Sequence, residues 1–185
     1  MNLKNPARYD TFSRLLHWLS ALAVTIAFVL GPGGFGRQMH QGLDPATRWD
    51  IVWHESLGLL VFALTAVRLL WLLVRPQAPR FDMPASMQLA AKLAHLGLWA
   101  LLLALPLTAL LGLGGEGHPL TLVGGYRLEQ IPVLGQWPLA RRLDWGELHG
   151  WLGDALIWLA GLHAVAAIYH HVHLKDGVLR SMLSR

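Results

Sequence analysis

The sequence predicts an all-α protein, a transmembrane four-helix up-down bundle. The chain of 185 residues is 54% hydrophobic and only 14% charged, which is more apolar than a soluble domain of this length requires. Four segments reach the length of about 20 residues that a helix needs to cross a bilayer, namely residues 10–30, 51–74, 89–113 and 146–173. The sequence has no internal repeat and no strong strand pattern. We therefore expect one integral membrane domain over residues 1–185.

Glycine and proline mark the ends of the first three segments. Gly31-Pro32-Gly33-Gly34 follows the first, Arg75-Pro76 the second and Gly114-Gly115 the third. Because the first segment ends in a glycine-proline turn and not in a small-residue cleavage signal, we expect a retained helix rather than a signal peptide. Pro106 predicts a local kink in the third segment. Residues 115–145 form the longest loop.

Cysteine content and charge exclude several classes of function. The chain has no cysteine, which excludes a disulfide framework, iron–sulfur ligation by thiolates, c-type haem attachment and a cysteine nucleophile. The formal net charge is +4, but the basic residues stand at the ends of apolar segments, which is the pattern of membrane proteins. We therefore expect membrane lipid, and no nucleic acid, as a partner.

The distribution of lysine and arginine predicts the orientation of the helices. One set of chain ends and loops holds nine of these residues, Lys4, Arg8, Arg14, Arg75, Arg80, Lys92, Lys175, Arg180 and Arg185, and the opposite set holds five, Arg37, Arg48, Arg127, Arg141 and Arg142. Cytoplasmic loops carry the excess of positive charge, so we expect both termini in the cytoplasm. Arg68 lies inside the second segment, toward its Arg75 end.

The last apolar segment carries two histidines in its interior. His149 and His163 are fourteen residues apart, which on an α-helix is a rise of about 21 Å and a net rotation of about 40°. Both imidazoles therefore project from one face at two depths. Polar side chains inside a membrane are costly and usually functional, so this spacing predicts two stacked cofactors rather than one site.

Depth sorts the other intramembrane histidines into an outer pair and an inner group. His54 lies near the outer end of its segment, level with His149. His17 and His95 lie near the inner ends of theirs, level with His163. Two neutral imidazoles that face each other across a bundle are the axial ligands of a low-spin b-type haem. A single one is more often a core histidine bonded to a carbonyl, but four at matched depths are hard to explain in that way.

Other polar residues near the inner end have open roles. His95 is suited to bond a haem propionate, to line a quinone pocket or to replace His17 as the inner ligand. Arg14, one turn before His17, is either a propionate partner or an arginine at the membrane edge. His170 and His171 are either a polar helix end or a quinone site, because histidine delivers protons near neutral pH.

Four stretches resemble the prokaryotic cytochrome b561 family. They cover nearly the whole chain except the first and third loops, and they read YDTFSRLLHWL, WHESLGLLVFALTAVRLLW, LAHLGLWALLLALPLTALLG and ELHGWLGDALIWLAGLHAVAAIYHHVHLKDGVLRSML. The resemblance implies a multi-pass, four-helix protein of the bacterial inner membrane with two b haems. It implies His17 with His163 as the axial ligands of the inner haem iron, and His54 with His149 as those of the outer one.

The resemblance also implies a class of function, a dihaem b-type cytochrome that transfers electrons across the inner membrane to the quinone pool. The alternatives within the class are a superoxide-oxidising quinone reductase and a haem-bearing membrane anchor subunit of a redox complex, so whether the chain is an enzyme stays open. Ubiquinone near His170 and His171 is the expected acceptor. Arg141 and Arg142 suit a periplasmic donor that is anionic, either superoxide or an acidic protein.

A histidine-lined metal transporter is the alternative outside this class. It requires histidine and carboxylate ligands gathered around one ion. Here the intramembrane histidines divide into two depths, with Asp154 the main carboxylate near them.

Overall fold

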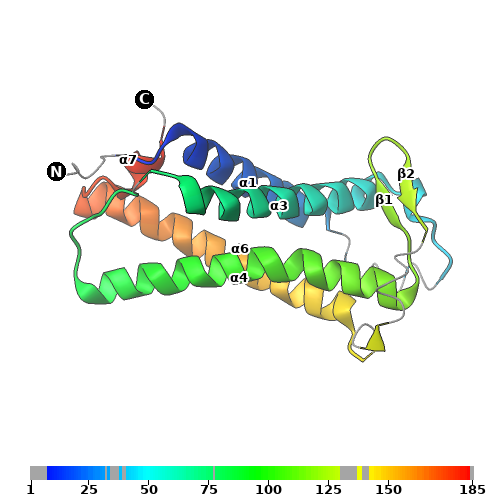
Figure 1. Ribbon diagram of the computed structural model, residues 1–185. Coiled ribbons are helices and arrows are strands. Elements are labelled where there is room, and N and C mark those ends of the chain that lie inside the picture. Colours follow the sequence, from blue (N-terminus) through cyan, green and yellow to red (C-terminus); the bar gives the residue numbers. More distant parts are fainter. Residues whose placement is uncertain are drawn as a thin grey trace.

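The computed structural model describes residues 8–31, 33, 38, 41–76, 78–129, 137–138 and 142–183. Within these residues four long helices run alternately up and down: α1 (Thr11–Leu30), α3 (Trp49–Val74), α4 (Ala85–Glu116) and α6 (Trp145–Tyr169). Helix α1 packs beside α3 and α4 beside α6, and the two pairs lie against each other as one bundle (Figure 1). The predicted all-α class is confirmed.

Two of the long helices begin at aspartate caps. The Asp10 carboxylate accepts hydrogen bonds from the N–H of Ser13 at 2.8 Å and from its hydroxyl at 2.6 Å. The same hydroxyl accepts from the indole N–H of Trp71 at 3.1 Å, which joins the start of α1 to the end of α3. Asp144 caps α6 by accepting from the N–H of Glu147 at 2.7 Å. Such caps satisfy the free N–H groups of a first helical turn.

Helix α4 is longer than the sequence pattern predicts. It continues through Pro106 and past the glycine pair at residues 114–115, and it ends only at Gly117, whose φ of 72° gives the left-handed cap typical of glycine. Two glycines near this end, Gly112 and Gly114, are buried inside the bundle. A Cβ at Gly112 would lie 3.5 Å from the backbone nitrogen of Gly146, so this glycine lets α4 approach the start of α6 closely.

A small hairpin lies in the loop for which the sequence predicts no strand. Strands β1 (Leu120–Leu122) and β2 (Tyr126–Leu128) pair antiparallel. Three-residue strands are too short to show an alternating pattern, and the turn between them relies on Gly124 and Gly125, both with positive φ. The hairpin is tied to α3, because the N–H of Val123 donates to the hydroxyl of Ser56 at 2.9 Å.

Three short elements complete the described chain. A 3₁₀ turn, η1 (Pro45–Thr47), precedes α3. The last helix is extended by η3 (His170–Leu174), a π-helical turn, and the chain then turns at Gly177 into α7 (Val178–Met182). Helix α7 lies at the start of α1, where the N–H of Tyr9 donates to the carbonyl of Ser181 at 3.2 Å.

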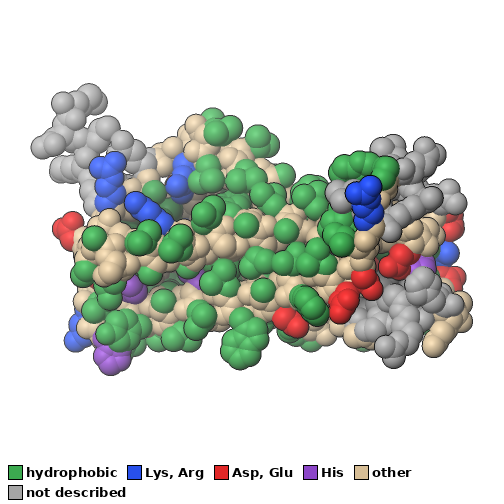
Figure 2. Space-filling view, turned by 90° about the horizontal axis from the view of Figure 1, so that it is seen from below, with side chains coloured by type: hydrophobic (Ala, Val, Ile, Leu, Met, Phe, Trp, Pro, Cys, Tyr) green, Lys and Arg blue, Asp and Glu red, His purple; other side chains and the backbone are tan. Residues whose placement is uncertain are grey.

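The bundle has the surface of a membrane protein. In the part of the chain that the structure describes, four helices are long and apolar enough to cross a membrane, namely Thr11–Leu30, Trp49–Val74, Ala85–Glu116 and Trp145–Leu174. Large apolar side chains point outward along them, with Leu73 81% and Trp158 76% exposed. Figure 2 shows hydrophobic side chains along the length of the bundle and charged ones gathered mostly toward its two ends.

The centre of the bundle is an apolar layer to which every long helix contributes one buried residue. The four are Ala23, Val61, Leu102 and Leu156. Leu156 is seven residues from both His149 and His163 on α6. The layer therefore separates two levels of histidine, one toward each end of the bundle.

Candidate functional site

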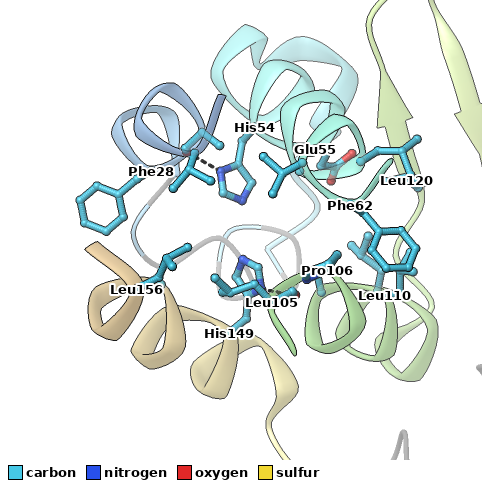
Figure 3. A pocket seen from close by; sticks show the side chains of 18 of the residues that line it. Phe28, His54, Glu55, Phe62, Leu105, Pro106, Leu110, Leu120, His149 and Leu156 are labelled. Atoms are coloured by element: carbon cyan, nitrogen blue, oxygen red, sulfur yellow. Dashed lines mark hydrogen bonds between the residues drawn. The ribbon is translucent and has the colours of Figure 1, made fainter. Parts of the chain in front are cut away.

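Two histidines face each other across a cavity at the hairpin end of the bundle, which is the predicted outer end. His54 comes from α3 and His149 from α6, and their ring centres are 5.9 Å apart with the ring planes inclined at 84° (Figure 3). A zinc–imidazole bond is about 2.0–2.1 Å long. On that scale, two imidazoles that share one metal ion have ring centres roughly 6 Å apart, so these two rings are spaced as a pair of ligands to one iron would be.

Carbonyl groups fix the protonation of both outer rings. The Nδ1 of His54 donates to the carbonyl of Ala27 at 2.8 Å, and the Nδ1 of His149 donates to that of Leu105 at 2.9 Å. Carbonyls only accept, so Nδ1 carries the proton and the Nε2 lone pair stays available. Metal-bound histidines are typically oriented in this way. The Ala27 carbonyl is available because the N–H of Gly31 bonds to Phe28 instead.

The cavity between these rings has apolar walls and room for a flat group. Side chains from all four long helices and from β1 line it, among them Val24, Phe28, Phe62, Leu105, Leu110, Leu120 and Leu156 (Figure 3). Glycine keeps two walls open, since a Cβ at Gly58 would meet nothing within 4 Å and one at Gly153 only Leu105 at 4.0 Å. A Cβ at Gly31 would lie 3.3 Å from the His54 ring, so glycine there lets α1 end against this histidine.

The inner histidines gather around His163. The ring of His17 on α1 is 6.3 Å from that of His163, and the ring of His95 on α4 is 5.2 Å from it. His95 is exposed, and its Nδ1 donates to the carbonyl of Ala91, one turn earlier, at 2.6 Å. The structure thus brings together all three histidines that the sequence placed at the inner level, and the His17–His163 separation is the one closer to that of the outer pair.

The comparisons with known proteins point to one family over almost the entire chain. The model of the family described as prokaryotic cytochrome b561 matches residues 8–185. The chain belongs to the prokaryotic cytochrome b561 family. It is 30% identical over 182 residues to cytochrome b561 homolog 2 of Escherichia coli (strain K12), covering 97% of this chain and 93% of that protein. It is also 30% identical over 182 residues to the probable superoxide oxidase CybB of Yersinia pestis, covering 96% and 97%.

Cytochromes b561 of this family bind haem b in the membrane, and the residues of this chain fit such a group. The donor set is histidine imidazole, which is the usual axial ligand of b haems. At the outer level the two rings are spaced for one iron, their Nδ1 protons are held by carbonyls, and the glycines beside them leave space. The four helices and the family also indicate an inner-membrane protein.

Glu55 belongs to the outer site of this cytochrome, although the sequence reasoning missed it. One carboxylate oxygen accepts from the backbone N–H of Thr121 on β1, and the other is buried without a hydrogen-bond partner among the described residues. The side chain lines the cavity next to His54 (Figure 3). Its position directly after His54 in the sequence was the available signal, because a carboxylate inside an apolar helix is costly without a role.

Arg14 lies at the inner edge of the bundle, where it holds the C-terminal segment. Its Nη1 donates to the carbonyl of Leu183 at 2.8 Å and its Nη2 to the hydroxyl of Thr11 at 3.1 Å. Trp18, one turn on, donates from its indole to the carbonyl of Met182 at 2.9 Å. The arginine is therefore engaged with the chain itself, and its predicted contact with a propionate stays a prediction.

The histidine cluster at the inner end is shaped by a π-helical turn. His170 pairs with Asp176, and His173 stacks against Tyr169 with ring centres 5.0 Å apart. The pKa of the Asp176 carboxyl lies below its usual value. Burial on its own raises this pKa, but the hydrogen bonds from His170 and from the N–H of Val178 together outweigh the effect of burial. An ionised Asp176 therefore orients the half-buried His170. His171, the other predicted quinone residue, is also half-buried.

The outer end carries arginines that are paired with carboxylates and one arginine, Arg142, that was predicted to attract a donor. Arg127 on β2 is paired with Asp44 and Glu129, and Arg48 with Asp50, so these arginines are neutralised locally. Arg142, one of the two residues predicted to attract an anionic donor, is exposed. Its predicted companion Arg141 lies outside the described residues.

The metal-transporter alternative gains no support from the part of the chain that the structure describes. Within it, no group of three or more histidine, cysteine, aspartate or glutamate side chains is placed to hold a metal ion. Asp154, the carboxylate nearest to such a role in the sequence, is exposed on the outside of α6. The histidines instead form one outer pair and one inner cluster.

Proposed function

We propose that this cytochrome holds two b haems, one at each level, and passes electrons across the inner membrane to the quinone pool. His54 and His149 are the axial ligands of the outer haem, and His17 and His163 those of the inner one. The observation that carries the proposal is the geometry of the outer pair, with ring centres 5.9 Å apart and each Nδ1 bonded to a carbonyl. The His17–His163 separation of 6.3 Å supports the same arrangement inside.

The chain's own contribution is to fix and insulate two redox groups. When bound, haem iron supplies one-electron chemistry, which amino-acid side chains at these positions do not. The carbonyls of Ala27 and Leu105 hold the outer rings in one tautomer. The buried layer of Ala23, Val61, Leu102 and Leu156 between the levels is apolar, and a charge is costly in such a low-dielectric interior, so electrons are expected to pass by way of the two sites.

We propose both termini in the cytoplasm, on the basis of the lysine and arginine count. A reporter fused to the C-terminus is then expected to report a cytoplasmic location. A reporter inserted at Gly124–Gly125, in the turn of the hairpin at the other end, is expected to report a periplasmic location. Alkaline phosphatase and a fluorescent protein, used in parallel at both positions, make the measurement. The reverse pattern at both positions would invert the electron path.

We place the quinone acceptor at the inner end, beside His170 and His171. The His170–Asp176 pair is the reason, because a histidine oriented by a carboxylate is suited to deliver a proton to a reduced quinone. Replacing both histidines by alanine is expected to leave the haem spectra intact and to slow reoxidation by ubiquinone by about a hundredfold, which is the scale of a lost proton donor.

Stopped-flow reoxidation of the dithionite-reduced protein by a soluble ubiquinone measures this effect. His173→Ala is the matched control, since His173 lies in the same turn but stacks on Tyr169. Intact spectra with an unchanged rate in the double variant, or an equal slowing in the control, dispose of the site.

Superoxide is the donor that one relative favours, because the protein from Yersinia pestis is named a probable superoxide oxidase. The exposed Arg142 at the outer end suits a small anion by electrostatic attraction. Replacing dithionite by an enzymatic superoxide source in the same measurement tests this. Haem reduction that superoxide dismutase abolishes identifies a superoxide-oxidising quinone reductase. Failure to reduce leaves an acidic partner protein as the donor, or an anchor subunit of a redox complex.

A further inference from the structure

Arg68 occupies on α3 the position that a ligand histidine occupies on α6. On α6, His149, Leu156 and His163 follow one another at intervals of seven residues, and on α3 His54, Val61 and Arg68 do the same. Intervals of seven keep side chains on one face of a helix in a bundle. Since His54 faces the outer cavity and Val61 is in the buried central layer, Arg68 continues the same face to the inner level.

The depth of Arg68 agrees with this assignment. It lies six residues before the end of α3, and His17 lies six residues after the start of α1, the antiparallel neighbour. At 1.5 Å per residue both are about 9 Å from the same end of the bundle. Helices α1 and α3 pack against each other, so Arg68 and His17 lie at the same level of the bundle. Arg68 therefore stands beside the inner histidines.

The guanidinium of Arg68 has an aromatic neighbour and no anionic one. Its Cζ lies 4.8 Å from the centre of the Trp99 ring on α4. Of the hydrogen bonds and ion pairs among the described residues, none involves Arg68. A cation inside a membrane protein is costly unless an opposite charge compensates it, and a cation–π contact offsets only a small part of that cost. The inner level thus carries an uncompensated positive charge.

The outer level differs in this respect. No lysine or arginine is among the described residues that line its cavity, and its one ionisable group other than histidine is Glu55. Two sites with similar histidine ligands therefore differ in their electrostatic surroundings, since a cation stands beside only the inner one among the described residues. A positive charge favours the reduced state of a nearby redox centre, because reduction adds one negative charge.

We propose that Arg68 is the counter-charge of the inner haem, and that its guanidinium raises the reduction potential of that haem. The inference rests on the proposed function, since it requires a haem at each level. Uptake of one electron makes the inner site more negative by one unit, and Arg68 stabilises that added charge without taking up a proton. Electrons that enter at the outer level are thereby drawn inward, toward the proposed quinone site.

A redox titration that resolves the two haems tests the proposal. The variants are Arg68→Gln, which removes the charge, and Arg68→Lys, which keeps the charge but not the planar stack on Trp99. Arg75→Gln is the matched control, since Arg75 also lies over an aromatic ring, that of Tyr9 at 5.8 Å, but at the end of α3. The His163→Ala variant identifies which of the two transitions belongs to the inner haem.

In the Arg68→Gln variant the inner haem is expected to bind its electron at least tenfold more weakly. This corresponds to a fall of about 59 mV in its reduction potential, because the couple transfers one electron. The reduction potential of the outer haem is expected to stay the same in this variant. The Arg68→Lys and Arg75→Gln variants are expected to keep the wild-type potentials of both haems. If Arg68→Gln loses the inner haem while Arg68→Lys retains it, the counter-charge acts on a propionate carboxylate, which also supports the proposal.

An unchanged inner potential in Arg68→Gln would overturn it, as would an equal fall in Arg68→Lys, which would indicate a packing role. A wild-type protein with a single haem would instead refute the proposed function itself.

Discussion

Replacing His149 by alanine is expected to remove the outer haem and to halve the haem content, from about two per chain to about one. The reason is geometric. His149 and His54 are the two rings that face each other across the outer cavity at 5.9 Å, and alanine leaves one ring with no partner on the other side of the iron. The measurement is the pyridine haemochrome of the purified variant, together with its reduced spectrum.

Two further variants sharpen this prediction. If both rings serve one iron, His54→Ala gives the same loss, and the double variant His54→Ala with His149→Ala loses no more than either single one. His118→Ala is the control, because His118 lies at the same end but pairs with Glu116. A His149→Ala protein that kept two low-spin haems would contradict the ligand assignment at the outer level.

Replacing His163 by alanine is expected to remove the inner haem and to leave the outer one. His163 is the ring that both other inner histidines approach, at 6.3 Å for His17 and 5.2 Å for His95, so every pairing at this level includes it. The same haemochrome assay applies, and the remaining spectrum is expected to be the one that His149→Ala lacks.

The partner of His163 is decided by two single replacements. His17→Ala is expected to lose the inner haem and His95→Ala to retain it, because His95 is exposed and bonded to its own helix. The opposite result, with loss in His95→Ala and retention in His17→Ala, would move the inner ligand from α1 to α4. Retention of the inner haem in His163→Ala would refute the inner site as described.

The sequence predicted the helices well because their signal is local. Length and hydrophobicity define a membrane span, and α1 and α3 begin and end within two residues of the predicted limits. Helix α4 was predicted too short because Gly114 was read as a stop, whereas it is buried and the helix continues to Glu116. The hairpin was missed because its strands have three residues each and are held by Glu55 and Ser56 of a distant segment.

The candidate site was predictable where helix periodicity fixes it and not where tertiary contacts do. The spacing of His149 and His163 predicted two histidine levels and depth paired His149 with His54, and in the structure the rings of His149 and His54 face each other. At the inner level three histidines share one depth, so their relative distances could come only from the packing of α1, α4 and α6. The carbonyls that accept hydrogen bonds from the outer rings belong to other helices, so the sequence around each histidine could not predict them.

Haem content of the wild-type protein tests the central claim most directly. The protein is purified in detergent with its haem retained, the haem is quantified as the pyridine haemochrome, and the chain is quantified by amino-acid analysis. The two-level arrangement of histidines predicts about two b haems per chain. A ratio near one or near zero would contradict the proposal of a dihaem cytochrome.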